Sequence, residues 1–167
     1  MATAALRSPS LRTVNQFDTP LAGPFALDVP SAKDALGLVL GTIDAHEEAE
    51  VLGPYKNAQW AMFSQWLGYR LYVTLHFAQV ESSPTNGQYG LSLLHSLWRA
   101  AVETQVNYAA LQFSMFNGAA WHGMVPQQGS SWAPTLIAGK QGFYEVSLAL
   151  VSRDLVANPG EWAQQQW

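Results

Sequence analysis

Two long uncharged stretches constrain what this chain can fold into. No Asp, Glu, Lys or Arg occurs between Glu103 and Lys140, and a second such stretch extends from Ser82 to Trp98. Over the whole chain these four residue types make up only 12% of the sequence, about half the share usual for a soluble domain. Because 49% of the residues are hydrophobic, we expect a folded chain that covers part of its surface with another molecule.

Composition also excludes several classes of protein. A net charge of -4 and few basic residues argue against a specific nucleic-acid binder, which needs clustered Lys and Arg. The most apolar segment, residues 58–80, is interrupted by Gln65, Arg70 and His76, so no membrane span is predicted. The absence of cysteine excludes disulfides and thiolate chemistry but does not indicate a compartment.

The positions of proline predict the domain organisation. Pro9, Pro20, Pro24 and Pro30 prevent any long helix near the start, so residues 1–30 are predicted to form an extended N-terminal arm. Residues 31–167 are predicted to form a single globular domain. The arm is too apolar for a solvated linker, and its acid-free opening leaves a targeting segment as an alternative.

Hydrophobic spacing favours an all-α fold of about four helices. Apolar residues recur at helical spacing over residues 32–49, 55–80, 91–116 and 135–156. An α+β fold is the alternative, with strands near residues 69–80 and 143–151. In the first of these, Leu71, Val73, Leu75 and Phe77 alternate with polar residues and tyrosine, which is typical of a strand.

The tryptophans are the candidate interface residues. The chain has seven of them, too many to fit within one small core. Trp121 and Trp132 lie in the long loop predicted for residues 117–134, and Trp162 and Trp167 lie in the C-terminal tail. Because Trp is enriched at protein interfaces, we predict that these four anchor a partner. A pocket for a small apolar ligand would use the same residues.

Motifs for catalysis and metal binding are absent from the sequence. The four histidines do not occur in HxxxH or HExxH spacing, so neither a metal nor a cofactor is predicted. No serine lies in a GxSxG or SxxK arrangement, so the sequence gives no support for nucleophilic catalysis. The weak candidates for polar contacts to a ligand are His76, His95, Arg99 and Glu103.

Two functional hypotheses follow from these patterns. The first is a self-associating structural subunit of a larger assembly, for example a component of a viral or phage particle, without catalytic activity. Its partners would be copies of itself. The alternative is a small ligand-binding domain or enzyme with an aromatic-lined apolar pocket. The sequence does not indicate where in a cell the protein functions.

Overall fold

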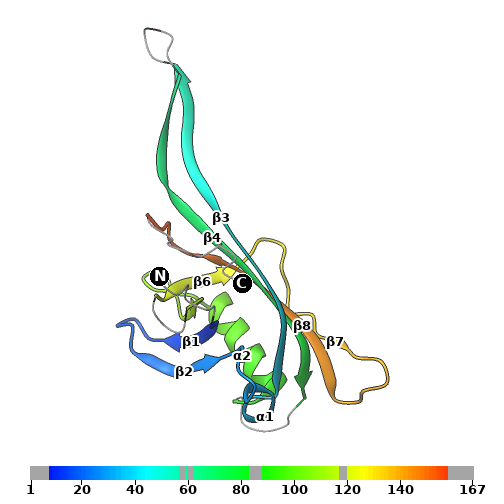
Figure 1. The fold of residues 1–167 in the computed structure, drawn as a ribbon. Helices are drawn as coiled ribbons and strands as arrows, with labels where there is room; N and C mark the ends of the chain where they lie inside the picture. Colours follow the sequence, from blue (N-terminus) through cyan, green and yellow to red (C-terminus); the bar gives the residue numbers. More distant parts are fainter. Residues whose placement is uncertain (1–7, 57–58, 60–61, 83–87, 117–119, 158–167) are drawn as a thin grey trace, which may run out of the picture.

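The computed structural model describes residues 8–56, 59, 62–82, 88–116 and 120–157. In chain order the elements are β1 (Ser10–Val14), β2 (Pro20–Ala26), α1 (Ala32–Ala35), β3 (Leu38–Lys56), β4 (Met62–Glu81), α2 (Gly90–Val102), β5 (Leu111–Ser114), β6 (His122–Pro126), β7 (Thr135–Leu136) and β8 (Phe143–Ser152). The strands form one antiparallel sheet in the order β2-β1-β5-β6-β8-β4-β3, and β7 pairs with β8 (Figure 1).

The all-α prediction, and with it the description of the protein as helical, is wrong. The part of the chain that the structure describes is mostly antiparallel sheet and has two helices, one of them a single turn. Segments 55–80 and 135–156, predicted as helices, form β4, β7 and β8, and segment 32–49 contains α1 and the first part of β3. The strands considered as the alternative, near 69–80 and 143–151, fall within β4 and β8.

Pairing between strands explains this outcome. In β4 the buried residues Leu71, Val73, Leu75 and Phe77 recur every second position, and Val146, Leu148 and Leu150 do the same in β8. Such a period of two buries one face of a sheet. Hydrogen bonds between β4 and β8 then favour the extended backbone over the helical one. Because the two strands are far apart in the sequence, hydrophobic spacing alone does not predict that they pair.

The core lies between α2 and one face of the sheet (Figure 1). Leu93, Leu94, Leu97, Trp98 and Ala101 occupy the inner side of α2 and belong to the same cluster of buried residues as the strand positions just named. This helix is shorter than the predicted 91–116 because the chain turns after Glu103 and returns as β5, whose four residues are all buried.

Part of the predicted N-terminal arm forms strands. β1 lies between β2 and β5, and its Leu11 and Val14 are buried. β2 is an edge strand with mostly exposed residues. Residues 10–14 therefore contribute to the same sheet and core as the rest of the chain.

The longest feature of the fold is the hairpin formed by β3 and β4, which projects away from the body (Figure 1). β3 has 19 residues, which at roughly 3.3 Å per residue makes it about 60 Å long. We call residues 50–56 and 62–68 the distal ribbon. Within the described residues the distal ribbon pairs only with itself, because pairing of β4 with the rest of the fold ends at Tyr69, which forms a bridge to Val156.

Candidate functional sites

Large apolar side chains are exposed on the distal ribbon. Their exposed fractions are 46% for Val51, 44% for Leu52, 46% for Tyr55, 58% for Met62, 49% for Trp66 and 42% for Leu67. Val51 pairs with Trp66 and Leu52 pairs with Gln65. Since neighbouring residues of a strand point to opposite faces, apolar groups are exposed on both faces of the ribbon.

The base of the hairpin is fixed to the body by Arg70. Its Nε donates a hydrogen bond to Glu50 Oε1 at 2.9 Å, and its Nη1 donates to the carbonyl oxygens of Ser152 and Arg153 at 3.1 and 2.8 Å. Beside it, the Leu71 amide donates to Ser152 Oγ at 2.9 Å. These contacts connect β3, β4 and the end of β8, so the direction of the ribbon is defined where it leaves the body.

Acidic and aromatic groups surround the next residues of the hairpin. The His46 ring stacks on Tyr72 with 4.8 Å between ring centroids, and His46 Nε2 lies 3.3 Å from Glu48 Oε1. Burial and the negative charge of Glu48 raise the pKa of Tyr72. The phenol therefore stays neutral at physiological pH and serves as a stacking surface.

Two of the four predicted interface tryptophans lie in the described part of the chain. The ring of Trp132 stacks on His95 with a centroid separation of 4.9 Å, and the Arg12 guanidinium lies 4.2 Å from the centroid of Trp121. Both tryptophans are partly exposed. Trp162 and Trp167 lie outside the described residues.

The four predicted ligand contacts come from two sides of the sheet. His95, Arg99 and Glu103 follow one another along the exposed side of α2, where Arg99 Nε is 4.0 Å from Glu103 Oε1. His76 alternates with the buried Leu75 and Phe77, so it points away from α2. The structure thus brings three of these residues close to each other and places the fourth on the opposite face.

On that opposite face His76 has two partners that the sequence did not reveal. Its Nδ1 lies 2.9 Å from Ser147 Oγ on β8, and its Nε2 lies 2.9 Å from Asp44 Oδ2 on β3. These residues are far apart in the sequence, and only the register of three strands brings them together. The alternation in residues 69–80 and 143–151 was the available signal, but it does not specify register.

A polar pocket with aromatic walls lies beside the β1–β2 turn, β5 and the start of β6. It has a volume of about 400 Å³, and its lining includes Phe17, Asp18, Tyr108, Gln112 and Trp121. The Gln112 side-chain amide donates to Asp18 Oδ1 at 2.8 Å and accepts from Arg12 Nε at 2.8 Å. Asp18 is the one non-glycine residue with positive φ, 60°, in the described chain, a backbone conformation often found at binding sites.

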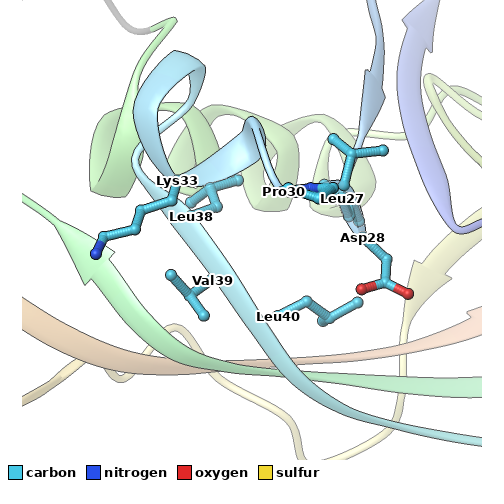
Figure 2. A pocket seen from close by; sticks show the side chains of 8 residues that line it. Leu27, Asp28, Pro30, Lys33, Leu38, Val39 and Leu40 are labelled. Atoms are coloured by element: carbon cyan, nitrogen blue, oxygen red, sulfur yellow. The ribbon is translucent and has the colours of Figure 1, made fainter.

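A second hollow lies between α1 and the start of β3. It has a volume of about 340 Å³ and is lined by Leu27, Asp28, Val29, Pro30, Lys33, Leu38, Val39 and Leu40. Figure 2 shows the Asp28 carboxylate and the Lys33 ammonium at opposite sides of the aliphatic groups. This hollow has no aromatic lining residue, unlike the pocket that the sequence suggested.

Other kinds of site were also sought. Over residues 8–157, leaving aside the undescribed gaps, no three His, Asp or Glu side chains are grouped so as to hold a metal ion. Neither helix in that range has the length and apolar character needed to cross a membrane. Comparison of the chain with models of protein families finds no match, and comparison with curated proteins finds none either.

Proposed function

We propose that the protein is a self-associating structural subunit whose distal ribbon contacts a neighbouring copy. The observation that supports this most directly is a two-stranded projection with half-exposed apolar side chains on both faces. A two-stranded hairpin alone is at best marginally stable in water, and exposed apolar clusters of this kind typically mark interfaces.

A second copy is the proposed occupant because the body carries further exposed apolar groups that could receive the ribbon of a neighbouring chain. Phe17 and Leu21 are 76% and 68% exposed in the turn after β1 and at the start of β2, and Val102 and Val106 are 56% and 89% exposed at the end of α2 and just after it. These four side chains are exposed in the single chain, so the distal ribbon, which projects from the body (Figure 1), does not cover them. A projection and a separate receiving surface on one chain are what head-to-tail association requires.

Sedimentation velocity from about 1 to about 100 µM protein tests this proposal. The wild-type chain is expected to form oligomers whose fraction rises with concentration. In the double variant Met62→Thr and Trp66→Thr, threonine keeps the strand propensity but removes apolar area. The oligomers of this variant should therefore dissociate at a protein concentration at least about tenfold higher than those of the wild type. The control Gln65→Thr should associate like the wild type. A monomeric wild-type chain throughout this range would contradict the proposal.

Small-ligand binding is a second candidate function, supported by the aromatic-walled pocket. Gln112 is 8% exposed, and its amide is held on both sides by Asp18 and Arg12, so the polar wall is organised without a ligand. Trp121 and Tyr108 supply ring surface for the apolar part of a small molecule.

Native mass spectrometry of the gently purified protein tests the second candidate. A bound small molecule should appear as a discrete additional mass that is lost in Trp121→Ala. In the control Trp132→Ala, which changes a ring outside this pocket, the additional mass should remain. If no additional mass appears and a panel of ring-containing polar compounds leaves the melting temperature unchanged, this function is excluded for the pocket.

A further inference from the structure

The face of the sheet away from α2 carries a chain of three functional groups. Ser147 Oγ is 2.9 Å from His76 Nδ1, and His76 Nε2 is 2.9 Å from Asp44 Oδ2. A carboxylate only accepts hydrogen bonds, so the proton of the neutral imidazole is assigned to Nε2, which donates to Asp44. Nδ1 then has a free lone pair and accepts the hydrogen bond of the Ser147 hydroxyl.

This arrangement has the elements of an activated nucleophile. A hydroxyl lies within hydrogen-bond distance of a base, and a third group orients the base from its other side. Backbone pairing places all three residues near one another: His76 is opposite Ser147 in the β4–β8 pairing, and Asp44 is opposite Thr74, two residues along β4 from His76, in the β3–β4 pairing. The geometry is therefore set by the sheet, with no loop involved.

Space for a small reactant adjoins the serine. A hollow of about 250 Å³ is lined by Gly41, Thr42, His76, Ala78, Glu145, Ser147 and the neighbouring Phe77. The register shifts near Gly41 in β3 and again after Phe77 in β4, and such bulges are frequent beside active sites. The side chains of His76 and Asp44 are 41% and 75% exposed, so solvent and reactant reach them directly.

We propose that Ser147 is a nucleophile that accepts the acyl group of small carboxylic esters, with His76 as its base and Asp44 as the residue that orients the base. Ser147 Oγ forms a bond to the ester carbonyl carbon while His76 Nδ1 takes the hydroxyl proton. The carbon–oxygen bond to the alcohol breaks, and His76 returns the proton to the departing alkoxide. Water then cleaves the acyl-serine by the same route and releases a carboxylic acid.

The chain contains a matched pair that lacks the nucleophile. His46 Nε2 lies 3.3 Å from Glu48 Oε1 on the same strand as Asp44, and its ring stacks on Tyr72. An exposed imidazole beside a carboxylate is thus present twice, once between β4 and β3 and once within β3. Only the His76 site has a serine on the remaining ring nitrogen among the contacts described.

The test is labelling of the full chain with a fluorophosphonate probe, which forms an oxygen–phosphorus bond to an activated serine and releases fluoride. Mass spectrometry of peptides locates the label, and 4-nitrophenyl acetate gives a parallel rate of acyl transfer. We expect label on Ser147, none at that position in Ser147→Ala, and labelling at least about tenfold slower in His76→Gln and Asp44→Asn. The control His46→Gln should label like the wild type.

Two results would overturn the proposal. One is label distributed among many serines with Ser147 no faster than the exposed Ser96. The other is an unchanged rate in His76→Gln, whose amide preserves hydrogen bonding to both neighbours and so keeps the strands in place. Circular dichroism of each variant establishes that it is folded, and Asp44→Glu, which retains a carboxylate, should recover part of the rate lost in Asp44→Asn.

Discussion

Gly90 shows how one residue defines the start of α2. Its φ is 53°, and a Cβ at this position would collide with the carbonyl oxygen of Glu81 at the end of β4. Gly90→Ala is expected to reduce the free energy of unfolding by more than about 2 kcal/mol, because the obstructing atom is backbone. Gly129→Ala is the control, since Gly129 has φ 80° but open space where a Cβ would lie, and should lose about 1 kcal/mol. Urea unfolding of the two variants measures the difference, and equal losses would exclude the collision.

His122 makes a pH-dependent contribution to stability. Burial on β6 lowers its pKa below the ordinary value of 6.5. The unfolded chain therefore binds this proton more readily than the folded one, so stability is retained above pH 6.5 and falls as acid is added through the folded-state pKa. Melting temperatures between about pH 7.5 and about pH 5 should fall less in His122→Asn than in the wild type. Parallel curves for the two proteins would contradict this.

At the scale of elements, the sequence predicted apolar segments better than it predicted their conformation. Residues 71–77 have both a helical stripe and strict alternation, and pairing with β3 and β8 selects the strand. The segment of α2 was predicted as a helix because its hydrophobic spacing has no competing alternation, although its end at Val102 was missed. The projection of β3 and β4 was not predicted, because Gly53 and Pro54, which lie within β3, are also typical of a break between two helices and separate the segments 32–49 and 55–80.

Arg70 is expected to hold the orientation of the hairpin. Its side chain is 25% exposed and donates to two carbonyl oxygens and to Glu50. Arg70→Met keeps much of the aliphatic volume but leaves these acceptors without their donor, so unfolding free energy should fall by about 1–3 kcal/mol. Arg99→Met, at an exposed ion pair 4.0 Å long, should change it by less than about 0.5 kcal/mol. Chemical denaturation measures both, and equal effects would show that the Arg70 contacts carry no stability.

At the scale of the molecule, the sequence indicated that some surface is covered but not which surface. Low charge and abundant Trp gave that expectation, and the candidates were Trp121 and Trp132 in the loop 117–134 together with Trp162 and Trp167 in the C-terminal tail. In the described chain, many of the exposed apolar groups lie on the distal ribbon, at positions such as Met62 and Trp66, which belong to the segment 55–80 that was predicted as a helix. The Ser147–His76–Asp44 chain was equally out of reach, because it depends on the register of three strands.

Removing the distal ribbon separates folding from association. Ala49 and Tyr69 are register partners, so an Asn-Gly turn between them would close a shorter hairpin. Among the described side chains of residues 50–68, none belongs to the cluster of buried hydrophobic residues. Arg70 would keep its two carbonyl acceptors while losing Glu50. The shortened chain is therefore expected to melt cooperatively within about 5 °C of the full chain and to sediment as a monomer. Oligomers of the shortened chain would place the contact on the body, and loss of cooperative melting would show that the ribbon is needed for folding.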